Sequence, residues 1–179
     1  MTVLFSRPLR STLAAALLAA AALPAQAAPL RPLPADWDFT LPSLDGERFV
    51  TASKEPGPLL INFWGVDCAP CLAELPLLQE LADGTSGWRV LLVATDPPAD
   101  ALRMLQRLHV TLPGARGGQG ARALMRDAGN THGALPFSVL MRDGRACAHH
   151  LGVVNEWTLP KLLAQCPPAN APADAPGQP

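Results

Sequence analysis

Two cysteines separated by two residues, Cys68 and Cys71, place the strongest constraint on this chain. An apolar run precedes them at residues 58–64 and is typical of a buried strand, while residues 69–81 carry the pattern of a helix. The pair therefore stands where a strand passes into a helix N-terminus, whose free N–H groups and dipole favour an anion. A thiolate is such an anion and is the form that attacks disulfides, so the pattern predicts thiol–disulfide chemistry.

The rest of the chain alternates between strand and helix patterns. Residues 37–50 are expected to form a short hairpin that turns at Asp45-Gly46. Further strands are expected at 59–64, 88–95, 137–141 and 146–151, and helices at 69–81, 99–108, 121–126 and 157–166. The glycine-rich residues 114–120 are predicted to be a mobile loop. This order predicts an α/β sandwich around a central mixed sheet.

The first 27 residues have the features of a secretory signal peptide. Arg7 and Arg10 precede an apolar stretch at 13–23, and a small-x-small cleavage site at 25–27 places the expected mature N-terminus at Ala28. The apolar stretch is shorter than the roughly twenty residues of a membrane span, although an uncleaved membrane anchor is the alternative. The sequence therefore predicts export, followed by a proline-rich linker at 28–36, one domain at 37–166 and a disordered Pro/Ala-rich tail at 167–179.

Charge excludes two classes of partner. Removal of the signal takes away two arginines and leaves 12 basic against 15 acidic residues. This balance provides no footprint for nucleic acid. Nor does the chain carry the cluster of lysines and arginines that recognises anionic lipid.

The cysteines fit disulfides better than metal. An exported chain with four cysteines is expected to use them in pairs, and a single Cys-x-x-Cys supplies only half the ligands of a zinc site. Cys147 opens the last strand and Cys166 closes the last helix, so a structural disulfide forms if that helix runs back along the strand. Two buried free thiols are the alternative. No metal site and no small-molecule cofactor is predicted.

Two motifs carry a family resemblance that covers nearly the whole mature chain. The first is Asn-Phe-Trp-x-x-x-Cys-x-Pro-Cys-x-x-Glu-x-Pro, met by Asn62, Phe63, Trp64, Cys68, Pro70, Cys71, Glu74 and Pro76. The second is Ala-Leu-Pro-Phe-Ser-Val-Leu at 134–140, followed by Asp143-Gly144. In this order the motifs resemble the thioredoxin superfamily and, within it, the exported TlpA/ResA-like branch. The resemblance implies a thioredoxin-like sandwich with an N-terminal hairpin extension and a periplasmic location.

The expected roles of the site residues follow from these motifs. Cys68 lies nearer the helix N-terminus and solvent and is the expected nucleophile, while Cys71 resolves the mixed disulfide. By resemblance, Pro136 follows a cis peptide bond that leaves the backbone of Leu135 free to pair with a substrate strand. Glu74 lies on the same helix side as Cys71, and the resemblance implies that it either accepts the proton of Cys71 or modulates the pKa of Cys71. A solvated surface glutamate is the alternative for Glu74.

The residues around the cysteines are expected to contact the substrate. They are Trp64, Asp67, Ala69 and Pro70. Asp67 stands where the family usually carries tryptophan, and a carboxylate next to Cys68 opposes the stabilisation of its thiolate by the helix dipole.

The sequence thus predicts an exported disulfide reductase whose partners are proteins with disulfides or thiols. The resemblance implies a membrane electron donor, and it implies apocytochromes c or copper-site proteins as substrates. Two alternatives remain: a peroxiredoxin-like peroxide reductase, and a copper-binding or chaperone module that uses Cys68 and Cys71.

Overall fold

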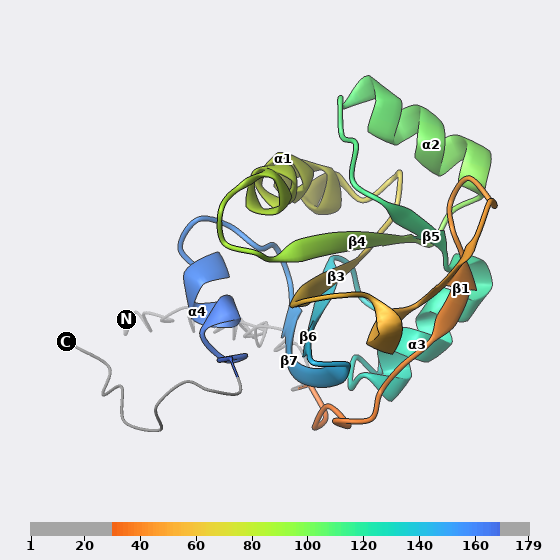
Figure 1. Cartoon of the computed structure of the whole chain (residues 1–179). Helices are drawn as coiled ribbons and strands as arrows, with labels where there is room; N and C mark the ends of the chain where they lie inside the picture. The colour runs from red at the N-terminus through yellow and green to blue at the C-terminus, as the bar shows by residue number, and fades with distance from the viewer. Residues whose placement is uncertain (1–29, 169–179) are drawn as a thin grey trace, which may run out of the picture.

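The computed structural model describes residues 30–168. The predicted signal peptide and most of the predicted tail lie outside the described residues. Figure 1 shows a central sheet covered by helices on both faces, which confirms the predicted α/β sandwich. Within the described residues, no helix combines the length and apolarity that crossing a bilayer requires.

The central sheet is mixed and has the strand order β5-β4-β3-β6-β7. Its strands are β3 (Leu59–Trp64), β4 (Arg89–Ala94), β5 (Gly114–Arg116), β6 (Phe137–Arg142) and β7 (Arg145–Leu151). β4 runs parallel to β3 and to β5, whereas β6 pairs antiparallel with β3 and β7. β3 is therefore the middle strand, and all its residues are buried. This position explains why every residue of the strand except Asn62 is apolar.

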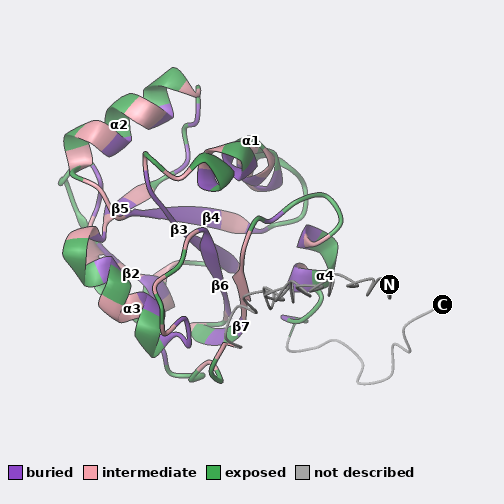
Figure 2. Cartoon of the chain, turned by 180° about the vertical axis from the view of Figure 1, so that it is seen from behind, coloured by how far each residue is buried: buried purple, intermediate pink, exposed green. Residues whose placement is uncertain are grey.

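Helices divide between the two faces of the sheet. Side chains of α1 (Ala69–Asp83), α2 (Pro98–Arg107) and α4 (Leu159–Leu163) share one apolar cluster with one face of β3 and β4. The helix α3 (Ala121–Asp127) packs on the other face, together with the hairpin of β1 (Thr40–Pro42) and β2 (Phe49–Thr51). Between these layers β3 is buried along its whole length, and β4 and β6 are buried except for one residue at an end (Figure 2).

The prediction of a mobile loop at residues 114–120 is wrong. Residues 114–116 form β5 beside β4, and residues 118–120 form a short 3-10 helix. The glycines permit close approach of the backbone: a Cβ on Gly114 would lie 3.0 Å from Leu44, and one on Gly117 would lie 2.7 Å from Val93. Glycine is therefore required here by packing, a demand that composition alone does not distinguish from mobility.

Both ends of the domain also differ from prediction. The closing helix α4 is shorter than residues 157–166, because Oδ1 of Asn155 accepts hydrogen bonds from the backbone of Trp157 and Thr158 and forms a turn instead. The described part of the predicted linker packs onto the domain. The N–H of Arg31 donates to Gly129 at 3.0 Å, and Leu33 contacts the apolar cluster beneath α3.

A disulfide joins Cys147 and Cys166, as the sequence predicts, with their Cα atoms 5.5 Å apart. Cys166 is buried, and its carbonyl accepts a hydrogen bond from Nε of Arg142. The chain after α4 is thereby tied to the edge strand β7, which is separated by β6 from the strand β3 that leads to the Cys-x-x-Cys segment.

We expect the Cys147→Ser/Cys166→Ser variant to lose about 3 kcal/mol of unfolding free energy, because the bond closes a loop of roughly twenty residues in the unfolded chain. Urea unfolding of the oxidised proteins measures the difference. The single Cys147→Ser variant is the control and should lose as much, because one cysteine alone cannot close the loop. Unchanged stability in the double variant would contradict a structural role for this bond.

Candidate active site

The Cys68–Cys71 pair lies directly after the buried middle strand. β3 ends at Trp64, and α1 begins at Ala69 with Cys68 as its N-cap. The backbone N–H of Cys71 donates to Sγ of Cys68 at 3.3 Å, and Pro70 occupies the first turn, where its missing N–H costs nothing. The two cysteines form a disulfide with Cα atoms 5.2 Å apart. Their arrangement matches the predicted strand-to-helix junction.

The two sulfurs differ in access to solvent. Cys68 is half-buried, whereas Cys71 is completely buried. Asp67, Ala69 and Pro70 are exposed around Cys68. A partner can therefore approach Cys68 but not Cys71, which is the order that the sequence predicts for a nucleophilic and a resolving cysteine.

The loop that leads to Cys68 is held by the segment after β4. The N–H of Val66 donates to Oδ2 of Asp96 at 2.9 Å, and Thr95 donates through both its backbone N–H and its Oγ1 to the carbonyl of Trp64. Sequence reasoning missed Thr95 and Asp96. Their position in the sequence, directly after the strand β4, could have indicated this role. Parallel strands end at the same edge of a sheet, so residues after β4 lie beside residues after β3.

The loop before β6 closes the site from another side. The Leu135–Pro136 peptide bond is cis. Leu135 reaches the site, since a Cβ on Gly65 would lie 3.6 Å from its Cδ1. Asn130, which sequence reasoning also missed, bonds both the N–H and the carbonyl of Ala134 and thereby fixes the loop.

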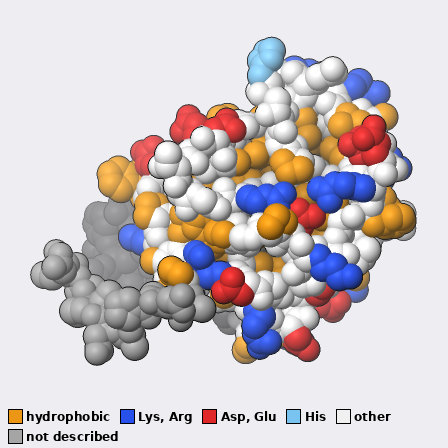
Figure 3. Space-filling model, viewed as in Figure 1, with side chains coloured by type: hydrophobic (Ala, Val, Ile, Leu, Met, Phe, Trp, Pro, Cys, Tyr) orange, Lys and Arg blue, Asp and Glu red, His pale blue; other side chains and the backbone are white. Residues whose placement is uncertain are grey.

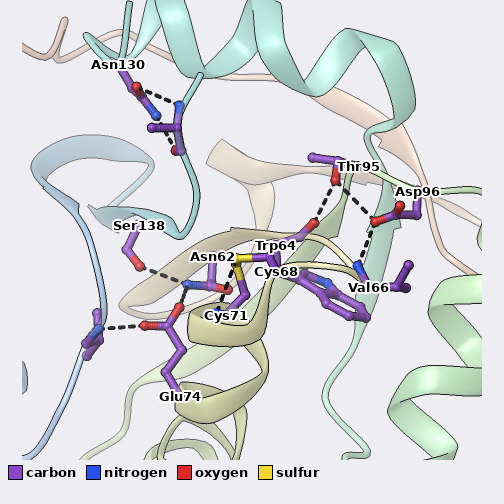
Figure 4. The surroundings of a disulfide bond; sticks show 12 residues. Asn62, Trp64, Val66, Cys68, Cys71, Glu74, Thr95, Asp96, Asn130 and Ser138 are labelled. Atoms are coloured by element: carbon purple, nitrogen blue, oxygen red, sulfur yellow. Dashed lines mark hydrogen bonds between the residues drawn. A yellow bond between two sulfur atoms is a disulfide. The ribbon is translucent and has the colours of Figure 1, made fainter. Parts of the chain in front are cut away.

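Glu74 is buried rather than solvated, so the surface alternative is wrong. Its side chain is 1% exposed. Oε1 accepts from Nδ2 of Asn62 at 2.7 Å, and Oε2 accepts from the backbone N–H of Val154. Nδ2 of Asn62 also donates to the hydroxyl of Ser138 at 3.1 Å. Figure 4 shows this chain of contacts on one side of the disulfide, with Thr95 and Asp96 on the other.

Burial raises the pKa of Glu74 to about 7, because a charged carboxylate loses its hydration there. The hydrogen bonds from Val154 and Asn62 act in the opposite direction and offset part of the rise in pKa. One helical turn separates Glu74 from Cys71. The site thus combines a buried sulfur with a carboxyl group that titrates near neutral pH.

Two buried polar atoms among residues 30–168 have no hydrogen-bond partner, and both belong to β3 next to the pair. They are Oδ1 of Asn62 and Nε1 of Trp64. Trp64 is completely buried, so it supports the site from beneath and does not offer a surface to a partner. The prediction that Trp64 contacts the substrate is therefore wrong. Within the same residues, no group of three or more His, Cys, Asp or Glu side chains is arranged to hold a metal ion.

Comparison with known proteins places this geometry in context. A family model described as the AhpC/TSA family matches residues 34–165. The thiol-disulfide oxidoreductase ResA of Halalkalibacterium halodurans is 29% identical over 79 residues, which are 42% of this chain and 45% of that relative. The chain therefore matches less than half of that relative's length.

Solved structures establish the fold. A putative thioredoxin from Neisseria meningitidis superposes with a TM-score of 0.60 at 24% identity, over 75% of this chain and 89% of that one. A putative thiol:disulfide interchange protein DsbE from Chlorobium tepidum gives 0.62 at 24% identity, over 76% and 99% of the two chains. The predicted thioredoxin-like fold is confirmed.

The pKa of Glu74 yields a prediction for stability against pH. Because the folded-state pKa lies above the value of 4.5 for an unperturbed glutamate, the folded protein binds the extra proton between these values. The stability contribution of Glu74 is full below about pH 4.5 and falls as pH rises through 7. We expect the unfolding free energy of the wild type, relative to Glu74→Gln, to fall by about 3 kcal/mol between pH 4.5 and 8.

Denaturant unfolding of both oxidised proteins across this pH range measures the difference. Glutamine does not titrate, so its own contribution to the unfolding free energy does not change with pH. The slope against pH of the difference between the two proteins therefore reports the titration of Glu74. Glu80→Gln, an exposed change on the same helix, is the control and should show no such slope. A flat difference between the wild type and Glu74→Gln would contradict the raised pKa.

Proposed function

The chain belongs to the AhpC/TSA family and has a thioredoxin-like fold, and from this premise we propose that it is an exported thiol–disulfide oxidoreductase that cycles between the Cys68–Cys71 disulfide and a dithiol. One observation carries the proposal. The two sulfurs share a disulfide at a helix N-terminus, with the outer one open to a partner and the inner one sealed.

The reaction begins with the reduced protein. The Cys68 thiolate, stabilised by the N–H of Cys71 and the helix N-terminus, attacks one sulfur of a partner disulfide. A Cys68–partner bond forms, and the other partner sulfur leaves as a thiolate. The Cys71 thiolate then attacks Sγ of Cys68 and expels the second partner thiolate. The partner gains two electrons and two protons, and the protein returns to its disulfide form.

Glu74 is the proposed acceptor for the proton that Cys71 loses before its attack. A carboxyl group with a pKa of about 7 can take up and release a proton near neutral pH, which suits a general base. The contacts from Asn62 and Val154 fix its position one turn from Cys71. Asn62 cannot take this proton, because an amide is not basic, so the titratable role falls to Glu74.

We further propose that the protein works in the reducing direction in the periplasm. The proposed partners are apocytochromes c or copper-site proteins with oxidised cysteines, in line with the TlpA/ResA-like motif and with the oxidoreductase name of the ResA relative. A reductant in an oxidising compartment needs an outside supply of electrons, for which a membrane donor is proposed.

A peroxiredoxin-like peroxide reductase is the second candidate. Such enzymes are expected to have the same fold as this chain, and the description of the matching family model includes AhpC. Such enzymes carry a Thr-x-x-Cys nucleophile, whereas Gly65 stands three residues before Cys68 here. Their resolving cysteine is separate, whereas Cys71 is bonded to Cys68 within the first turn of α1. The site therefore favours disulfide exchange over peroxide reduction.

Cys68→Ser should abolish reduction of the insulin disulfides, because no thiolate remains at the accessible position. Cys71→Ser should retain the first attack and accumulate mixed disulfides, which can be captured from a periplasmic extract and identified by mass spectrometry. The Cys147→Ser/Cys166→Ser variant is the control and should keep full turnover.

Turnover by Cys68→Ser would refute the mechanism. Peroxide consumption by the wild type without an added thiol partner would favour the peroxidase. Stoichiometric copper retention by the reduced protein, without disulfide reduction, would favour the copper-binding alternative.

Export makes a separate prediction about the mature N-terminus. We expect the periplasmic protein to begin at Ala28, because the small-x-small site lies at residues 25–27. Intact-mass measurement of the periplasmic fraction tests this. An Ala27→Arg variant should block cleavage and leave the chain in the membrane fraction. Wild-type protein with an intact N-terminus in the membrane would instead support the uncleaved anchor.

A further inference from the structure

A groove of about 360 Å³ opens beside the segment that leads to the redox pair, on the side away from Glu74. Its lining includes Thr95, Gly118, Gln119, Arg122, Gly133 and Leu135, and we call it the Arg122 groove. A second hollow of about 480 Å³ shares three of these residues and adds Arg116 and Asp96. Because the two share Thr95, Gly118 and Gln119, together they form one continuous path along this side of the site.

The Arg122 groove begins where the active-site loops meet. A Cβ on Gly65 would lie 2.9 Å from Oγ1 of Thr95 and 3.6 Å from Cδ1 of Leu135, so both groove residues flank the segment that leads to Cys68. Figure 4 places Thr95 and Asp96 on the opposite side of the disulfide from Glu74. A polypeptide whose sulfur is attacked by Cys68 therefore passes close to this groove.

The glycine-rich segment keeps the groove open. Gly118 lines the groove and has nothing within 4 Å of the position that a Cβ would take, so the chain presents bare backbone there. Residues 114–116 of the glycine-rich segment thus pair with β4, whereas Gly118 carries no side chain that could fill the groove.

Charge in the groove is positive. Arg122 pairs with no carboxylate within the part of the chain that the structure describes, and its stem packs on Gly133, where a Cβ would lie 2.9 Å from Cγ of Arg122. Arg116 donates through Nε to the carbonyls of Ser43 and Leu44. The acidic residue of the path, Asp96, already accepts from Val66 and Thr95.

We propose that the Arg122 groove selects substrates, by binding a carboxylate-bearing segment of the partner next to the cysteine that Cys68 attacks. A guanidinium binds a carboxylate through two parallel hydrogen bonds, which gives direction as well as attraction. The inference rests on the proposed function and adds the charge of the substrate to it.

The attraction is local. The whole chain has a formal net charge of −1, and on the face shown in Figure 3 basic and acidic side chains are interspersed. An overall negative chain repels an acidic partner weakly at long range. A preference for acidic substrates must therefore arise at a defined cationic site, and Arg122, which lines the groove together with Thr95 and Leu135, forms no ion pair with another described residue.

The test uses short peptides that contain one cysteine and are joined as disulfide dimers. Three series carry Glu, Gln or Lys at successive positions on either side of the cysteine. The fully reduced wild-type protein is mixed with each peptide, and acid-quenched samples give the rate constant for peptide thiol release. We expect the best-placed Glu peptide to react about three- to five-fold faster than its Gln counterpart, as a partly exposed ion pair allows. Added salt should reduce this ratio.

Arg122→Gln should bring the Glu/Gln ratio to one by removing the advantage of the Glu peptide, because the removed contact is one of binding. Arg122→Glu should reverse the preference in favour of the Lys peptide. Arg126→Gln removes the same charge from an exposed position on α3 outside the groove and should keep the wild-type ratio.

The outcomes separate the inference from the proposed function. If the wild type reduces the Gln peptide but shows no Glu preference at any position, or if Arg122→Gln keeps the preference, the groove has no such role. If the wild type reduces no peptide at all, the proposed function fails instead.

Discussion

The site depends on a short loop that must connect a fully buried strand to an exposed helix N-terminus. β3 has neighbours on both sides and no exposed residue, so the chain can reach solvent only after Trp64. Val66 and the carbonyl of Trp64 are then bonded by Asp96 and Thr95, and Leu135 packs beside Gly65. These contacts leave Cys68 half-buried and Cys71 completely buried, and the proposed roles of the two sulfurs rest on this difference in access.

The buried carboxyl group at Glu74 is the second constraint, and it is costly. Burying a charge without partners is strongly unfavourable, so the protein supplies an amide from β3 and a backbone N–H from the segment after β7. The remaining penalty appears as the raised pKa. A side chain held at a cost in stability, one turn from the inner sulfur, is typical of a functional group.

The sequence predicted the parts of the site that depend on local spacing. Cys68, Cys71 and the helix that follows are adjacent in the chain, and Cys147 and Cys166 form the disulfide expected from a last helix that runs back along the last strand. It did not predict Asp96, Asn130 or Ser138, because their roles arise from which loops the sheet order brings together. The burial of Glu74 escaped prediction for the same reason: its partner Val154 lies 80 residues away. The glycines at 114–117 were misread because packing and mobility demand the same residue.

The residues proposed for chemistry and those proposed for recognition lie on opposite sides of the disulfide. One side holds three hydrogen-bonded side chains that are buried: Glu74, Asn62 and Ser138. Because a partner cannot reach them, they can act only on proton transfer at the sulfurs. Arg122, Gly118 and Gln119 line the groove on the other side, where they can contact what approaches Cys68. No hydrogen bond or ion pair between the described residues links the two groups directly. The pH dependence of the reaction and its preference for substrate charge should therefore respond to different residues, so a substitution on one side leaves the property governed by the other unchanged.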